Sequence, residues 1–257
     1  DVAPSRGLGD VYKRQAKILH EQFPKVRLHA STQCSVNSPE GFKALEEAGF
    51  VRAVIPREMS LEEIKEIRKA TDMELELFVH GALCMSVSGQ CYMSAMLGGR
   101  SGNRGLCAQP CRLPFSADES KSCDLSLKDL SLLSHLKEIE EAGVCSLKIE
   151  GRMKRPEYVA SAVTSCKKAL LGEYLPNDET VLKSVFSRSG FTDGYFTGKR
   201  QDMFGYRQKE DVIAAKDVLK ELSHLYDNET PLVPIKLDFI CRENEPIKLL
   251  SLIHISE

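Results

Sequence analysis

Apolar residues in the first part of the chain alternate between short runs, typical of buried strands, and the three-to-four-residue spacing of amphipathic helices. Ser38 before Pro39 fits a helix start, Gly49 fits a stop, and Ser60 with Glu63 fits a capping box. Strands and helices that alternate at this spacing predict a parallel sheet with helices packed outside it. The predicted strands are 26–30, 51–55 and 74–79, and the predicted helices are 16–22, 39–49 and 61–70.

The same alternation returns after residue 114. Gly143 fits the end of one helix, and Pro156 fits the start of the next. A stretch rich in glycine and aromatic residues, 189–205, is predicted to be a loop. The predicted helices here are 130–142, 155–171, 180–187 and 211–225, and the predicted strands are 144–149 and 232–240.

Residues 80–114 interrupt this pattern with a long stretch rich in Gly, Ser and Cys. Loops longer than about 12–15 residues usually carry function. Cys84, Cys91, Cys107 and Cys111 follow the spacing C-x6-C-x15-C-x3-C. Thiolates select zinc or iron–sulfur clusters, and structural zinc usually has two short ligand pairs. Only the second pair is short here, which favours a cluster; zinc, or four buried free thiols, are the alternatives.

Composition narrows the class of protein. The chain has 257 residues, 42% of them hydrophobic, with a net charge of −2, which argues against disorder and gives no global basic signal for nucleic acid. Nine cysteines without a signal peptide fit a reducing cytoplasm and a metal site better than disulfides. No apolar run approaches the roughly 18–20 residues of a membrane span. A cytoplasmic protein without a membrane partner is expected, and the oligomeric state stays open.

Topology predicts where a site would form. In parallel α/β sheets and barrels, sites lie at the carboxyl ends of the strands, here 29–33, 56–58, 80 with the cysteine loop, and 150–152. Their convergence would build one polar pocket. The alternatives are an Arg–carboxylate ion pair for each Glu, a satisfied strand-end role for the His, and solvated surface charges for the Arg residues. The candidate acid/base groups are His80, Glu58 and Glu150, and the candidate substrate-binding residues are His29, Gln33, Arg57, Arg100, Arg104 and Arg152.

Several motifs together resemble one known family. The stretches 78–91 (FVHGALCMSVSGQC) and 98–112 (GGRSGNRGLCAQPCR) look like the defining signature of the U32 peptidase family. Further matching segments follow in the same order, and the set is specific although each motif alone is not. The resemblance covers about residues 16–249, and its further segments are 29–33, 57–60, 127–130, 148–154 and 187–195.

The resemblance implies a fold and an activity. The implied fold is a partial TIM-like (β/α) barrel that lacks its first strands and carries the cysteine-rich loop as an insertion. Relatives hold a 4Fe–4S cluster on cysteines that match the four named above. They serve in oxygen-independent hydroxylation of uridine in tRNA, cytidine in ribosomal RNA, or ubiquinone precursors. The RNA hydroxylases use prephenate, and the segment after the barrel most resembles the ribosomal-RNA-modifying branch.

The expectation is therefore an RNA hydroxylase whose partners are RNA and a small dicarboxylate, and this fragment by itself is expected to be inactive. Two other interpretations compete. One is a collagenase-like peptidase with Cys84 as nucleophile and His80 as base, although no Ser–His–Asp order or HExxH motif is present. The other is a binding domain stabilised by zinc.

The two ends of the chain look different from the rest. Residues 1–15 lack an apolar period, and 250–257 follow a charged segment abruptly; both resemble translated sequencing adapters and are expected to be non-native. Residues 16–230 are expected to form the barrel portion with the cysteine loop at 80–114. Residues 231–249 are expected to begin a truncated following domain.

Overall fold

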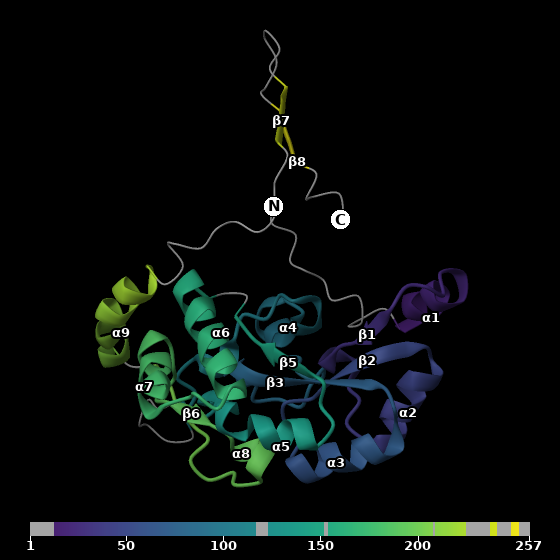
Figure 1. The fold of residues 1–257 in the computed structure, drawn as a ribbon, viewed down its shortest axis with the longest axis horizontal. Coiled ribbons are helices and arrows are strands. Elements are labelled where there is room, and N and C mark those ends of the chain that lie inside the picture. The colour runs from purple at the N-terminus through teal and green to yellow at the C-terminus, as the bar shows by residue number, and fades with distance from the viewer. Residues whose placement is uncertain are drawn as a thin grey trace. The chain divides into compact units, whose positions relative to one another are not determined.

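A computed structural model describes residues 13–116, 123–151, 154–207, 209–224, 237–240 and 248–251. The chain divides into two compact units, 1–222 and 223–257 (Figure 1). In the second unit, strands β7 (Leu237–Ile240) and β8 (Lys248–Ser251) pair antiparallel. The first unit contains every predicted site residue, so its sheet decides where those side chains lie.

The sheet of the first unit has six strands, paired in the order β1-β2-β3-β4-β6, with β5 alongside β3. All its pairings are parallel except β3 with β4. This confirms the predicted α/β class with a sheet rich in parallel pairs. Within the described strands, β1 and β6 do not pair with each other, so the sheet is open. The strands are β1 Leu28–Ala30, β2 Phe50–Ile55, β3 Glu74–Ala82, β4 Asp129–Ser131, β5 Ser146–Ile149 and β6 Phe191–Thr192.

Helices pack along the sheet, and α3 and α5 lie on the opposite side from α4 in Figure 1. Helix α3 buries Ile64 and Ile67, and the strand residues Leu75 and Leu77 belong to the same core. Burial of such side chains contributes roughly 1.5–3 kcal/mol each. The helices are α1 Lys13–Gln22, α2 Pro39–Glu47, α3 Leu61–Ala70, α4 Met93–Gly98, α5 Leu136–Glu141, α6 Pro156–Leu170, α7 Pro176–Val185, α8 Gly194–Thr197 and α9 Lys209–Leu222.

The predicted helix caps are confirmed. Ser38 Oγ accepts a hydrogen bond from the amide of Gly41 at 3.2 Å. Ser60 Oγ accepts one from the amide of Glu63, whose carboxylate in turn accepts from the amide of Ser60 at 2.7 Å. These bonds satisfy amides that a helix start leaves without partners, so the two helices begin where the sequence indicates.

The prediction of one helix over 130–142 is wrong. Residues 129–131 form β4, whose Leu130 lies opposite Gly81 of β3, and α5 begins only at Leu136. The same pairing extends β3 to Ala82, three residues beyond its predicted end. A leucine-rich run favours a helix by propensity, but pairing with a neighbouring strand overrides that preference. The stretch 189–205, predicted to be a loop, contains β6 and α8. Helix α7 begins at Pro176, four residues earlier than predicted.

His135 joins α5 to the segment that contains α8. Its Nε2 lies 3.0 Å from Asp193 Oδ2, and its Nδ1 lies 3.1 Å from Glu138 Oε1. The ring also packs against Phe196. Burial alone lowers the pKa of His135, but the two carboxylates outweigh it and raise that pKa above its ordinary value. The imidazolium is therefore the form that this contact favours.

We expect His135→Gln to destabilise the protein more in acid than in base. Because the folded-state pKa is raised, the contribution is fully present below the unfolded pKa of about 6.5 and is lost as the pH rises through the folded-state value. Urea titrations at about pH 5.5 and about pH 8.5 measure the difference, expected to be up to about 1 kcal/mol because both carboxylates are exposed. An equal loss at both pH values would contradict the charged contact.

Among the described residues, no helix is long and apolar enough to cross a lipid bilayer.

Candidate functional site

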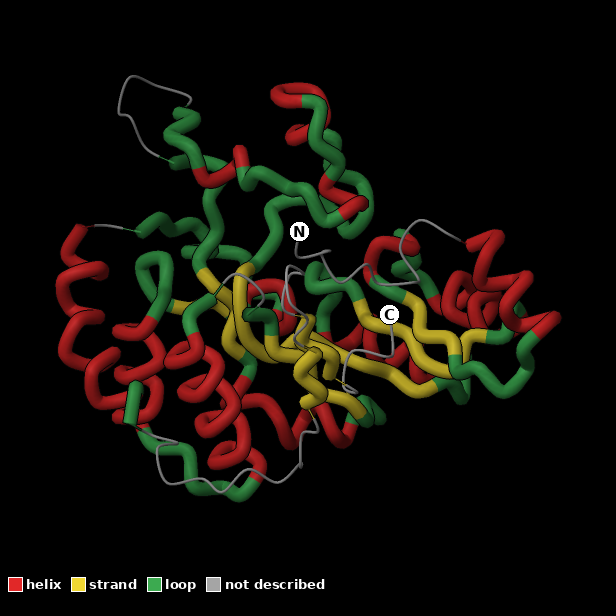
Figure 2. Tube along the Cα trace, turned by 90° about the horizontal axis from the view of Figure 1, so that it is seen from above, coloured by secondary structure: helices red, strands yellow, loops and turns green. Residues whose placement is uncertain are grey.

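The cysteine loop runs from β3 to β4 and extends away from the large helices, beyond one end of the strands (Figure 2). It contains α4 and two short 3₁₀ turns, Gly102–Arg104 and Pro110–Arg112. The guanidinium of Arg112 donates to the carbonyl of Leu83, to the carbonyl of Leu127 at 2.6 Å, and to Ser126 Oγ at 3.0 Å. Leu83 lies just after β3 and Leu127 just before β4. One partly buried side chain therefore fastens both ends of the loop.

All four cysteines of this loop are free thiols. Burial has the largest effect on the pKa values of Cys84 and Cys111, and smaller contributions come from Cys91 and Cys107, so the four thiols lie in the same part of the loop. Burial raises the pKa of the Cys84 thiol, although part of its surface is accessible, and it also raises that of Cys111. Within the described residues, no three His, Cys, Asp or Glu side chains are close enough to hold a single metal ion.

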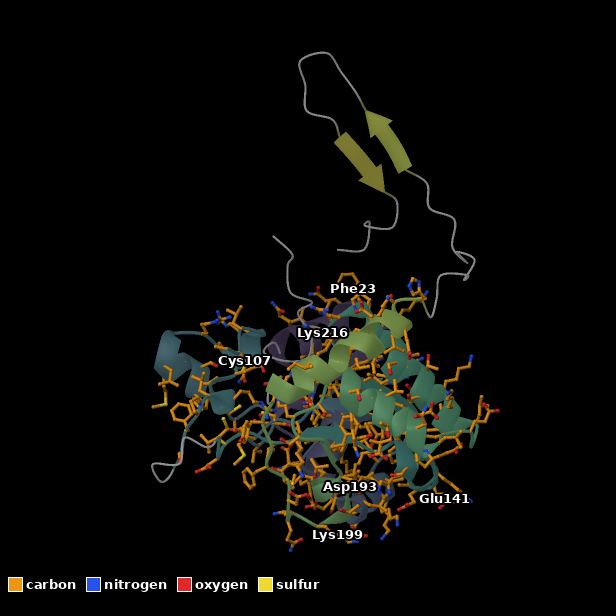
Figure 3. All side chains as sticks on the ribbon, turned by 90° about the vertical axis from the view of Figure 1, so that its left-hand side faces the viewer. Phe23, Cys107, Glu141, Asp193, Lys199 and Lys216 are labelled. Atoms are coloured by element: carbon orange, nitrogen blue, oxygen red, sulfur yellow. The ribbon has the colours of Figure 1, made fainter. Side chains whose placement is uncertain are left out.

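Two hydrogen-bond donors contact the sulfur of Cys107, which is labelled in Figure 3, and one of them is on α4. The amide of Gln109 donates to Cys107 Sγ at 3.3 Å, and Ser94 Oγ lies 3.7 Å from the same sulfur. At Cys84, a hydrogen bond from the backbone of Ser86 lowers the thiol's pKa, against the larger opposite effect of burial. Donors of this kind stabilise thiolates and tune the potential of metal centres that thiolates bind.

Strand ends meet the loop where the topology predicts. Glu58, after β2, accepts hydrogen bonds from the amide of Ser88 at 2.7 Å and from its hydroxyl at 2.9 Å. Arg57 forms an ion pair with Glu150, after β5, and its guanidinium lies 3.6 Å above the ring of Phe78. The ends of β2, β3 and β5 therefore join the loop in one polar region.

The end of β1 reaches the same loop through Gly89. A side chain at Gly89 would clash with Ser35 Oγ and approach the carbonyl of Gln33 within 3.0 Å, and its φ of +76° also favours glycine. Gln33 thus lies against the loop, and its buried Oε1 has no partner among the described residues. His29 is largely exposed on β1. Its pKa is lowered by partial desolvation of the ring and then by the charge of Arg52.

Two of the remaining candidate arginines lie on the surface of the cysteine loop. Arg100 and Arg104 are exposed on the cysteine loop, and neither forms an ion pair with a described residue. Arg152 lies outside the described residues.

His80 is sealed inside the protein, with only 1% of its surface exposed. Its ring stacks on Tyr158 and meets the edge of Phe191. Desolvation, with a smaller effect from Lys154, lowers the pKa of His80 to about 4. Neither ring nitrogen has a hydrogen-bond partner among the described residues, so His80 is neutral near pH 7 and is not bonded to Cys84.

A buried ion pair beside His80 was not predicted. Arg188 donates to Asp129 Oδ1 at 2.6 Å, and both residues are buried. Lys154 lies 2.7 Å above the ring of Phe186, and desolvation lowers its pKa to about 7. The segments that carry the family resemblance include all three charged residues, but nothing in their spacing distinguished them from surface charges.

We expect Arg188→Met to lower the free energy of unfolding by about 3–5 kcal/mol, because it leaves the buried Asp129 carboxylate without the guanidinium that donates to it. Adding Asp129→Leu is expected to recover most of the loss, since the uncompensated charge is removed too. Urea denaturation of the two variants gives both numbers. A double variant as unstable as the single one would show that packing, and not charge, causes the loss.

Comparison with known proteins identifies relatives of this chain. The sequence model of peptidase family U32 matches residues 15–204. The chain is 38% identical over 194 residues to the 23S rRNA 5-hydroxycytidine C2501 synthase of Escherichia coli, covering 73% of this chain and 29% of that protein. It is 37% identical over 160 residues to the tRNA hydroxylation protein P1 of Bacillus subtilis, covering 57% and 38%.

A third relative carries a different name. The chain is 33% identical over 211 residues to a collagenase of Porphyromonas gingivalis, covering 71% of this chain and 50% of that protein. The chain thus spans half or less of the length of these three relatives. No solved structure matches it.

Proposed function

This chain belongs to peptidase family U32, and on that premise we propose that it is part of an RNA hydroxylase. The proposed reaction adds a hydroxyl group to a pyrimidine, a cytidine of ribosomal RNA or a uridine of tRNA, without molecular oxygen. Prephenate is the proposed co-substrate and a 4Fe–4S cluster the proposed cofactor. Relatives named for hydroxylation of rRNA and of tRNA support the reaction class.

The observation that carries the proposal is the contact between Glu58 and Ser88. Ser88 lies between Cys84 and Cys91, and it fastens the cysteine loop to the end of β2 through two hydrogen bonds. Arg57, beside Glu58, forms the ion pair with Glu150. The thiols and the polar strand ends are therefore parts of one region, as a redox cofactor beside a substrate pocket requires.

The donor set fits an iron–sulfur cluster. Cys84, Cys91, Cys107 and Cys111 would hold it, and the donors at Cys84 and Cys107 would stabilise the thiolates. When bound, a 4Fe–4S cluster supplies one-electron transfer. Zinc on the same thiols is the alternative; it would require the sulfurs to move closer together than the described residues have them, and it would have no redox role.

The chain's own polar groups would bind and orient the substrates. Arg57 is suited to a carboxylate of prephenate, because a guanidinium fork matches that geometry and Phe78 holds its plane. Release of Glu150 from Arg57 would leave a carboxylate free to accept a proton. Glu58 is the second proposed acid/base group. His80 is the third, and as a neutral ring buried against Tyr158 and Phe191 it keeps one donor and one acceptor nitrogen.

The other candidates have positioning roles in this proposal. His29, Gln33 and Arg152 would complete the pocket, and Arg100 and Arg104 would contact RNA. We also propose that the open sheet is part of a TIM-like barrel, which fits its parallel strands and the greater length of the relatives. A site at the carboxyl ends of the strands is usual in that fold.

A cysteine peptidase is the less favoured function. Both nitrogens of His80 lack partners among the described residues, so the hydrogen bond from Cys84 that a nucleophile–base pair needs is not made. Burial also raises the pKa of Cys84, whereas an activated thiol has a lowered one. The arrangement of His80 and Cys84 in this chain therefore gives no support to the peptidase function that the name of the collagenase relative suggests.

We expect the full-length protein of which this chain is proposed to be a part, expressed without oxygen in cells that lack their own RNA hydroxylases, to add one oxygen atom to a pyrimidine of rRNA or tRNA. Mass spectrometry of digested RNA measures the product. Arg57→Gln is expected to lower its yield at least ten-fold, because the side chain keeps its size but loses the fork that binds a carboxylate. Arg27→Gln, at an exposed ion pair on the same sheet, is the matched control and should leave the yield unchanged.

Cells that cannot make prephenate provide the second comparison. Hydroxylation should stop in them and return when prephenate is supplied. Unmodified RNA in every strain, with folded protein present, would refute the proposed reaction; product without prephenate would refute the co-substrate alone.

A further inference from the structure

The outer side of the cysteine loop carries apolar side chains that the described chain does not cover. Tyr92, Met96 and Leu97 are 62%, 85% and 63% exposed. Tyr92 and Met96 are four residues apart across the start of α4, so they lie on one side of it. Soluble proteins rarely leave large apolar side chains together in water unless a partner binds them.

The formal charges within the sequence of the cysteine loop all have one sign. No Asp or Glu occurs from Leu77 to Ala117, in a chain that has 37 of them among 257 residues. Arg112 is used internally to fasten the loop, but Arg100 and Arg104 are exposed on the same loop as the apolar residues. Cations with no acidic neighbour in sequence are complementary to an anionic partner, and an aromatic face beside them suits unstacked bases.

We propose that Tyr92, Met96, Leu97, Arg100 and Arg104 form a docking surface for single-stranded RNA, hereafter the α4 surface. Tyr92 stacks on a base, Met96 and Leu97 support the neighbouring base, and the two arginines contact phosphates. The inference rests on the proposed function only in that RNA is the partner.

The position of α4 connects this surface to the proposed cofactor. Ser94, the buried residue of α4, accepts a hydrogen bond from the amide of Ala108 at 3.0 Å and lies 3.7 Å from Cys107 Sγ. The helix that presents the apolar residues is thus fixed to a proposed cluster ligand. RNA held on the α4 surface would be held next to the thiols.

The test measures binding of a fluorescein-labelled 12-nucleotide single-stranded RNA, and of the same sequence as a duplex, by anisotropy at several salt concentrations. The single strand is expected to bind more tightly, because a paired base cannot stack on a side chain. Tyr92→Ala should weaken binding roughly 5- to 100-fold, and Tyr92→Phe should preserve it, since stacking needs only the aromatic face. Leu97→Ala should also weaken binding. Leu171→Ala, at an equally exposed leucine at the C-terminal end of α6, is its control.

The arginines have a separate readout. Arg100→Gln with Arg104→Gln should reduce the slope of log affinity against log salt by about 1.4, or about 0.7 for each phosphate that an arginine no longer neutralises. Lys43→Gln with Lys65→Gln, at exposed positions on α2 and α3, is the control and should not change the slope. Circular dichroism verifies that each variant is folded.

The outcomes separate this inference from the proposed function. Weakened RNA binding in the α4-surface variants, with normal binding in the controls, supports the inference even if no hydroxylation is found. Normal RNA binding in those variants overturns it, even if hydroxylation is intact. RNA binding unchanged while Leu97→Ala alters the protein's oligomeric mass would overturn it too and make the surface a protein interface.

Discussion

The guanidinium of Arg112 closes the base of the cysteine loop, and the rest of the candidate site depends on that closure. It holds carbonyls on both sides of the loop, next to β3 and next to β4. Without it, the base of the loop would lose three hydrogen bonds, and the contact between Glu58 and Ser88 would remain as a tether to the sheet. A neutral carbonyl is a good partner for a buried cation only when several surround it, and here two carbonyls and a hydroxyl do so. Cys111 precedes Arg112 in the chain, so the hydrogen bonds of Arg112 also help to position this proposed ligand of the cluster.

A second contact gives the closed loop its orientation. Glu58 accepts two hydrogen bonds from Ser88, so the loop is fixed at its base by Arg112 and near its first two cysteines by a strand end. Behind it, the protein buries a neutral histidine and one carboxylate–guanidinium pair. Burial raises the pKa of Asp129 and lowers those of His80 and Lys154, so this region favours fewer charges. Such an interior is costly unless each remaining charge has a partner, which is why Asp129 and Arg188 occur together.

The sequence correctly predicted the helix starts, which depend on contacts between residues that are neighbours in the chain. Ser38, Ser60 and Glu63 cap their helices as expected, because a cap needs only neighbours in sequence. The convergence of Arg57, Glu58 and the segment of Glu150 followed from the rule that parallel strands end at one edge. Strand β4 was missed because its partner, β3, lies far away in sequence. Asp129, Arg188 and Lys154 were missed for the same reason, since only the folded chain shows that the first two are buried as a pair and the third is partly buried.

The function proposed here depends on a 4Fe–4S cluster bound by the four cysteines of the loop. The most direct test is the visible absorption of protein purified without oxygen, together with its iron, sulfide and zinc content. We expect a brown protein with about four iron and four sulfide per chain, lost in Cys107→Ala and kept in Cys166→Ala, where the cysteine is buried in α6. A colourless protein with one zinc per chain, or one without metal, would contradict it.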